Sequence, residues 1–291
     1  MIIRVVRAVI AAAVAVTAGS AITGCSAPPA PSTAYYLALG DSLSRGVQPD
    51  AAGASVETDQ GYPNRVYAGL LGAHPGLRLV QLGCPGETTE TMMHGGICSY
   101  QGGSQLAAAD AFLRAHRGHV LLVTIDIGAN DPESCGSQPS LKQLTSCIGD
   151  IPDAAANLSA ILASVRAAAG SGVRIVGMSY YLPALAEWRN GELGQVIARL
   201  GAQLAVVYND LLDRTYTKAG DAVADVFGAF DTTNFGNPTP VQGIGTLPRN
   251  VALICTWTWE CAPSPRGPNQ HANSAGYQVI ANVILKVAAV R

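Results

Sequence analysis

A serine near the start of the chain and a histidine near its end carry the clearest chemical signal. The serine, Ser42, lies in the segment Gly-Asp-Ser-Leu at 40–43, and the histidine is His271. A serine hydroxyl attacks an ester only when a base removes its proton and fixed donors hold the resulting oxyanion. Ser42 and His271 are therefore candidates for a nucleophile and its general base.

Two further polar clusters follow apolar runs. Gly86 lies in the cluster at 83–89, after the run at 78–82, and Asn130 lies in the cluster at 128–131, after the run at 120–127. Open parallel sheets place their ligand crevice at the carboxyl ends of the strands. We therefore expect these clusters to lie beside the serine segment, which follows a similar run at 35–39.

These four blocks, in this order, resemble the SGNH or GDSL family of esterases and lipases over about residues 35–290. The resemblance implies that Ser42 is the nucleophile and His271 the base. It also implies an oxyanion hole formed by the N–H groups of Ser42 and Gly86 and the side-chain amide of Asn130. These groups donate without carrying charge, and a glycine lets an acyl group approach the backbone closely.

One position departs from the family pattern, which usually has an aspartate three residues before the histidine. Here that residue is Pro268. The third group must accept the Nδ1–H of the imidazole so that Nε2 faces the serine, and a backbone carbonyl can do this. We assign this task to the Pro268 carbonyl. The Asn269 side chain is one alternative, and a carboxylate from a distant loop is another.

The first residues have the layout of a bacterial lipoprotein signal peptide. Two arginines precede an apolar stretch too short to span a bilayer, and the segment Ile-Thr-Gly-Cys at 22–25 resembles a lipobox. We predict a signal peptide at 1–24, lipid attachment at Cys25, a proline-rich tether at 25–34 and a hydrolase domain at 35–291. The protein would then be exported and anchored in the cell envelope. An ordinary secretory signal is the alternative.

The other six cysteines agree with export, because an even set in an exported chain favours disulfides. They fall into three pairs that are local in sequence: Cys84 with Cys98, Cys135 with Cys147, and Cys255 with Cys261. No tight Cys-x-x-Cys or clustered histidines indicate a metal site, and we expect neither a metal nor a cofactor.

Charge limits the possible partners. Loss of Arg4 and Arg7 with a signal peptide lowers the basic residues from 18 to 16, against 20 acidic residues. A chain of net negative charge is a poor electrostatic partner for nucleic acid or an anionic membrane surface. We expect a monomer that binds a small-molecule or lipid ester and meets the membrane only through its N-terminal lipid.

Strand-like runs alternate with helical patterns, which predicts a three-layer α/β/α domain with a flavodoxin-like, five-stranded parallel sheet. One helix is expected from Pro152 to just before Gly170. Another follows His271 and anchors its loop. The expected strands are 35–39, 78–82, 120–127, 173–179 and 224–229.

The combined prediction is an exported serine esterase or lipase that works through an acyl-enzyme on Ser42. A carbohydrate O-deacylase of envelope glycans is a second possibility, and a non-catalytic lipoprotein that binds an acyl ligand is a third. If Trp257 and Trp259 lie on an extended segment, both indoles face one side. They would then form an acyl or sugar platform, or pack in the core.

Overall fold

A parallel five-stranded sheet forms the centre of the domain in a computed structural model, which describes residues 33–131 and 141–288. The strand order is β4-β1-β5-β6-β7, and every neighbouring pair is parallel. Numbered along the chain, these five strands run 2-1-3-4-5, which is the flavodoxin-like order. The predicted fold class is confirmed. The strands are β1 (Ala34–Gly40), β4 (Leu77–Gln81), β5 (Val120–Asp126), β6 (Arg174–Met178) and β7 (Ala222–Ala224).

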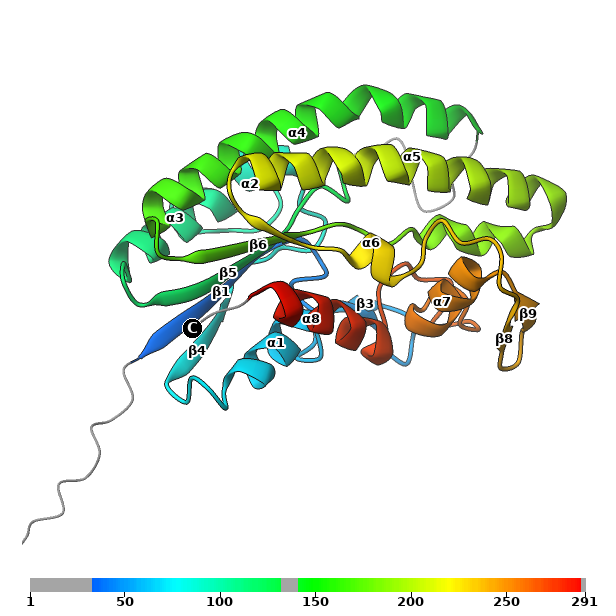
Figure 1. Ribbon diagram of the computed structural model, residues 1–291, viewed down its shortest axis with the longest axis horizontal. Helices are drawn as coiled ribbons and strands as arrows, with labels where there is room; N and C mark the ends of the chain where they lie inside the picture. Colours follow the sequence, from blue (N-terminus) through cyan, green and yellow to red (C-terminus); the bar gives the residue numbers. More distant parts are fainter. Residues whose placement is uncertain (1–32, 132–140, 289–291) are drawn as a thin grey trace, which may run out of the picture. The chain divides into compact units, whose positions relative to one another are not determined.

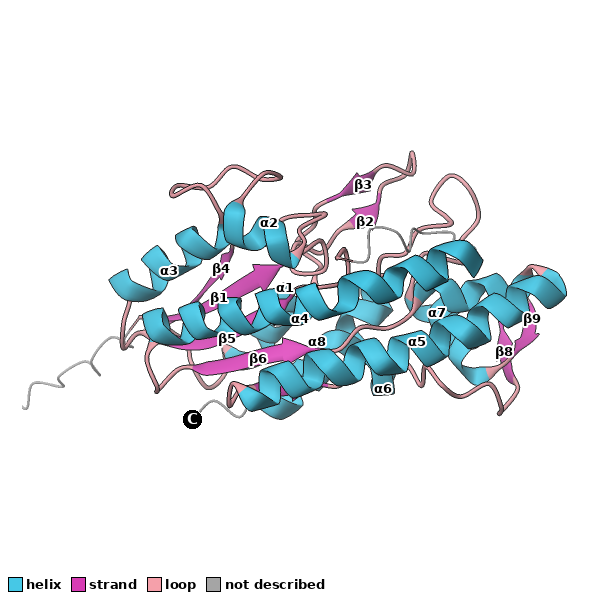
Figure 2. Cartoon of the chain, turned by 90° about the horizontal axis from the view of Figure 1, so that it is seen from above, coloured by secondary structure: helices cyan, strands magenta, loops and turns pink. Residues whose placement is uncertain are grey.

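Helices cover both faces of this sheet (Figure 1, Figure 2). One face carries α2 (Thr89–His94), α3 (Gln105–Ala115), α4 (Leu141–Ala169) and α5 (Gly191–Lys218). The other carries α1 (Tyr62–Leu70), α6 (Val226–Ala229), α7 (Arg249–Trp257) and α8 (Ser274–Ala288). Among the described residues, no helix has the length and apolar character needed to cross a membrane.

Short elements lie outside these layers. A 3₁₀ helix, η2, spans Pro183–Arg189. Two small antiparallel hairpins pair β2 (Gln48–Pro49) with β3 (Ser55–Val56), and β8 (Thr239–Val241) with β9 (Gly245–Leu247). Because the crossover helices occupy both faces of the sheet, such irregular segments and the loops after the strands are left to shape a site.

The core forms where the two helical layers meet the sheet. Central strands of a parallel sheet are buried on both faces and therefore need continuous apolar runs. The run from Tyr36 to Leu39 is fully buried, as are Leu158, Ile161, Leu162 and Val165 on α4. On α8, Ile280 and Ile284 are buried in the same core. The residues at helical spacing on α4 and α8 are therefore the ones that pack in the core.

Two predicted boundaries are wrong. The last strand, β7, ends at Ala224, and a short helix follows because the Asp225 side chain accepts the Gly228 N–H at 2.7 Å. Pro152 lies inside α4, which begins at Leu141 instead. The end of α4 is as predicted, since Gly170 follows it with a φ of 88°.

Strand β6 and helix α5 approach closely because Gly177 has no side chain. A Cβ at this position would lie 2.2 Å from the Tyr216 ring. That ring is fully buried, and its hydroxyl donates to the Ile125 carbonyl at 3.2 Å, so it has no free space to move into.

We expect Gly177→Ala to lower the free energy of unfolding by about 1–3 kcal/mol through overpacking. Gly172→Ala is the matched control, because nothing lies within 4 Å of a Cβ there. Chemical denaturation would measure both. Equal effects of the two substitutions would contradict this description of the packing.

Candidate active site

Ser42 begins a tight turn directly after β1. Its carbonyl accepts the N–H groups of Arg45 at 3.2 Å and Val47 at 3.1 Å. The turn starts from Gly40, whose φ of 130° brings the backbone against β5, and a Cβ there would lie 2.0 Å from the Asp126 carbonyl oxygen. The chain therefore changes direction sharply at the end of β1, and Ser42 is left partly exposed.

His271 meets Ser42 from the other end of the chain. Its Nε2 lies 3.0 Å from Ser42 Oγ. The loop that carries it is held on both sides: the His271 carbonyl accepts the Trp259 N–H at 3.0 Å, and the Gln270 carbonyl accepts the Tyr181 hydroxyl at 2.9 Å. Asn273 then caps α8 through the Ala275 N–H at 3.0 Å. The helix and the loop together fix the imidazole.

The partner of Nδ1 differs from our assignment. Asn269 Oδ1 lies 2.8 Å from His271 Nδ1, so the acceptor is this side chain and not the Pro268 carbonyl. The same oxygen accepts the backbone N–H of His271 at 3.1 Å. This is an Asx turn, in which an asparagine bonds to the backbone two residues on. The turn brings the side-chain oxygen to the ring, and the alternative that the sequence left open is the observed one.

The two bonds to Asn269 Oδ1 also fix the tautomer of His271. A backbone N–H can only donate, so the asparagine atom that it meets must be the oxygen. The amide nitrogen agrees with this orientation, because it donates to Ser55 Oγ at 3.0 Å. Nδ1 therefore carries the hydrogen, and the lone pair of Nε2 faces Ser42.

Burial lowers the pKa of His271 to about 4. The group in contact with Nδ1 is neutral, so no carboxylate offsets the loss of solvation. The imidazole is consequently in its neutral, proton-accepting form throughout the physiological pH range. This agrees with a base oriented by an amide and not by an acid.

The predicted oxyanion hole consists of three N–H groups on the loops that follow β1, β4 and β5. Within the described residues, the N–H groups of Ser42 and Gly86 donate to no protein acceptor. Asn130 Nδ2 donates one hydrogen to the Glu87 carbonyl at 2.9 Å and keeps its second. That bond places Asn130 next to the loop of Gly86. Each of the three predicted donors thus has a hydrogen that no acceptor in the described residues takes, and their role as an oxyanion hole stays a prediction.

The loop of Gly86 is held in place where it enters α2. Asp131 accepts the Thr89 N–H at 2.9 Å and also the Thr89 hydroxyl, so it holds the start of α2 against the loop after β5. The Thr88 side chain caps the same helix through the Thr91 N–H at 3.1 Å. Asp131 therefore serves as a brace in the structure.

Two buried carboxyl groups lie beneath the serine turn. Asp41 accepts the Leu43 N–H at 2.9 Å, and Asp126 accepts the Ser44 N–H at 3.0 Å and the Tyr62 hydroxyl at 2.5 Å. Burial, and next the charge of Asp41, raise the pKa of Asp126 well above its usual range. Asp126 was not among the residues predicted from the sequence, although an acid at the end of an apolar strand is a visible signal.

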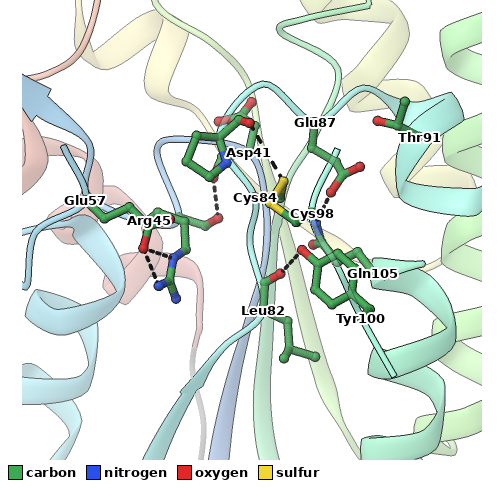
Figure 3. The surroundings of a disulfide bond; sticks show 12 residues. Asp41, Arg45, Glu57, Leu82, Cys84, Glu87, Thr91, Cys98, Tyr100 and Gln105 are labelled. Carbon is green, nitrogen blue, oxygen red and sulfur yellow. Dashed lines mark hydrogen bonds and ion pairs between the residues drawn. A yellow bond between two sulfur atoms is a disulfide. The ribbon is translucent and has the colours of Figure 1, made fainter. Parts of the chain in front are cut away.

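Disulfides flank both halves of the site. One disulfide joins Cys84, which lies two residues before Gly86, to Cys98 (Figure 3). The other joins Cys255 to Cys261, ahead of the histidine loop. The third predicted pair, Cys135 with Cys147, lies outside the residues whose side chains are described. These two pairs are those predicted, and each closes a loop that contains or precedes part of the site.

The two tryptophans near the histidine do not form one extended face. Trp257 is the last residue of α7, and its ring packs edge-on against Phe230 at 5.1 Å. Trp259 instead donates through its indole nitrogen to Gln48 Oε1 at 3.3 Å. Trp257 belongs to the core, and Trp259 ties the histidine loop to the segment after the serine turn.

Comparison with known proteins now identifies the class. Residues 38–279 match the GDSL-like lipase/acylhydrolase family, so the chain belongs to this family. Members of the family hydrolyse carboxylic esters, and the chain is a carboxylic ester hydrolase. No curated protein matches it.

Solved structures of low sequence identity share the fold. A lipase from a goat rumen metagenome has a TM-score of 0.55 at 17% identity, with 89% of this chain and 98% of that one covered. An extracellular lipase from Streptomyces rimosus has a TM-score of 0.50 at 20% identity, with coverages of 86% and 99%. An α/β hydrolase from the metagenome of Lake Arreo has a TM-score of 0.50 at 18% identity, with coverages of 88% and 94%.

The low pKa of His271 predicts the pH dependence of hydrolysis. We expect kcat/KM, which reports the free enzyme, to fall only as the pH drops toward about 4. Asn269→Asp places a negative charge at Nδ1, which favours the protonated imidazole. It should therefore raise the pH at which kcat/KM falls, the acidic limb of the pH profile, by about one to three units.

Gln270→Glu is the charge-matched control for this measurement. It adds the same charge on the residue directly before the histidine, at an exposed side chain that makes no hydrogen bond within the described residues. Its acidic limb should stay near that of the parent enzyme. Equal shifts in the two variants would contradict a specific contact between Asn269 and Nδ1.

Proposed function

We propose that the protein is an exported serine esterase or lipase that acts through an acyl-enzyme on Ser42. The distance of 3.0 Å between Ser42 Oγ and a properly oriented His271 Nε2 carries this proposal. His271 takes the serine proton as Oγ attacks the ester carbonyl. The N–H groups of Ser42 and Gly86 and the remaining amide hydrogen of Asn130 hold the oxyanion.

The second half of the reaction uses the same groups. When the tetrahedral intermediate collapses, the protonated Nε2 gives its hydrogen to the leaving alcohol, and the acyl group stays on Oγ. A water molecule then attacks the acyl carbon and passes its proton to Nε2. Release of the acid returns the hydrogen to Ser42. Asn269 keeps Nδ1 protonated throughout, so the cycle needs no aspartate.

The proline at position 268, where the family usually has an aspartate, is the one sequence feature that favours a non-catalytic, acyl-binding protein. Asn269 provides the acceptor that the aspartate would supply, and it does so without charge. An anionic partner stabilises the imidazolium as it forms, whereas a neutral amide fixes only the tautomer and the ring orientation. We therefore propose a dyad whose base is oriented but receives no charge stabilisation.

Ser42→Ala should abolish both hydrolysis of p-nitrophenyl esters and labelling by a fluorophosphonate, because it removes the atom that attacks. Ser44→Ala is the control from the same turn. Ser44 Oγ donates to the Asp41 carbonyl at 2.7 Å and is fully buried, so this variant should lose stability but remain labelled. Retained hydrolysis in Ser42→Ala would show that another nucleophile acts.

The proposal of export is supported by the two disulfides, which persist mainly in oxidising compartments. Lipid attachment at Cys25 is a further proposal, and that residue lies outside the described residues. It rests on the lipobox-like segment alone. A lipid there would hold the domain at a membrane surface without any spanning helix.

Cys25→Ser tests the lipid anchor. Expressed with its full N-terminus in a bacterial host, the parent protein should partition into the detergent phase. The variant should stay in the aqueous phase or accumulate unprocessed, since it lacks the acceptor thiol. Equal partitioning of both proteins after normal processing would contradict lipid attachment.

A further inference from the structure

A buried glutamine connects the strand before the nucleophile to the loop that supplies an oxyanion donor. Gln105 is the first residue of α3 and is fully buried. Its Oε1 accepts the Gly40 N–H at 2.6 Å, and its Nε2 donates to the Gly40 carbonyl at 3.0 Å. The same Nε2 donates to Glu87 Oε2 at 3.0 Å, a contact visible in Figure 3.

Every hydrogen-bonding group of this amide has a partner. One oxygen and two N–H groups make three bonds, as a buried amide requires. The side chain is directed inward by the cap of α3, where Ser104 Oγ accepts the Ala107 N–H at 3.1 Å. A fully satisfied polar network in the interior is rigid, because each bond would be costly to leave unmade.

The contacts of Gln105 lie next to all three oxyanion donors. Gly40 stands two residues before Ser42. Glu87 directly follows Gly86, and its carbonyl accepts the Asn130 amide at 2.9 Å. The path from Gly40 through Gln105 and Glu87 to Asn130 therefore joins three loops that the sequence brings from separate strands.

We propose that Gln105 is a positioning residue that sets the spacing of the three oxyanion donors. The inference rests on the proposed function, since those donors matter only if Ser42 forms a tetrahedral intermediate. Gln105 itself does not touch the reacting atoms. Its removal would leave the donors in place but free to move relative to one another.

This role has a kinetic signature. Charge on the oxyanion develops in the transition state, so displaced donors lower kcat and leave KM nearly unchanged. A structural glutamine would affect stability alone. The His271–Asn269 contact is separate, and its acidic limb in the pH profile should not move when Gln105 is changed.

The hydrogen bond between Gln105 and Glu87 can be removed by a substitution at either residue. Gln105→Met keeps the volume and removes all three bonds, and we expect it to lower kcat roughly 10- to 100-fold with KM within about twofold. Glu87→Met removes only the bond to Glu87 and should lower kcat in the same direction. Glu87→Gln still offers an acceptor oxygen, and should keep kcat within about threefold of the parent.

The double variant, Gln105→Met with Glu87→Met, tests whether both act through one link. Its kcat should be no lower than that of Gln105→Met alone, because the bond between the two residues is already absent. Independent, additive losses would overturn the proposal. So would an unchanged kcat in folded Gln105→Met. If Gln105→Met does not fold, a kcat in Glu87→Met equal to that in Glu87→Gln overturns it.

Ser42→Ala, assayed in parallel, distinguishes a failure of the proposed function from a failure of the positioning role of Gln105. Hydrolysis that survives in Ser42→Ala means that the proposed function is wrong. An inactive Ser42→Ala together with normal kcat in both methionine variants means that only the positioning role of Gln105 is wrong.

Discussion

The side-chain oxygen of Asn269 accepts two hydrogen bonds from His271, one from its backbone N–H and one from Nδ1. The first bond fixes which end of the amide faces the histidine, and the second then fixes which ring nitrogen carries the hydrogen. Nε2 is left with a lone pair directed at Ser42. A change in this one contact would alter the tautomer, the ring orientation and the pKa of the base together.

The remainder of the site depends on the sheet. The order of its strands changes direction between β1 and β5, and a crevice at the carboxyl ends of the strands is expected at such a point. The Ser42 turn follows β1, and the loop with Asn130 follows β5. The loop of Gly86 follows β4, on the other side of β1. The proposed nucleophile and the proposed oxyanion donors thus come from three adjacent strands, while His271 comes from the loop before α8.

The sequence predicted those parts of the molecule that depend on local order along the chain. Apolar runs located the strands, and the residues directly after them located Ser42, Gly86 and Asn130. The predicted position of the last strand is wrong because Asp225 caps a short helix there. This cap is a local signal that competes with the apolar run. For Nδ1, two acceptors one residue apart were both feasible, and the choice between Pro268 and Asn269 depends on how the loop folds.

Beyond the four blocks that the family resemblance brings together, contacts between distant segments could not be predicted from one sequence. Gln105 lies 65 positions from Gly40, and nothing in its neighbourhood indicates that its amide pairs with a strand end. Asp126 was visible as an acid after an apolar run, but its pKa depends on burial and on Asp41, which come only from the packed structure. In both cases, the missing information is which loops meet at the end of the sheet.

The most direct test of the oriented, neutral dyad is a nitrogen NMR titration of the His271 side chain in the resting enzyme. The account predicts that hydrogen stays on Nδ1 at neutral pH and that the ring becomes protonated only near pH 4. A ring that carries its hydrogen on Nε2, or that titrates above the ordinary histidine pKa of about 6.5, would contradict it.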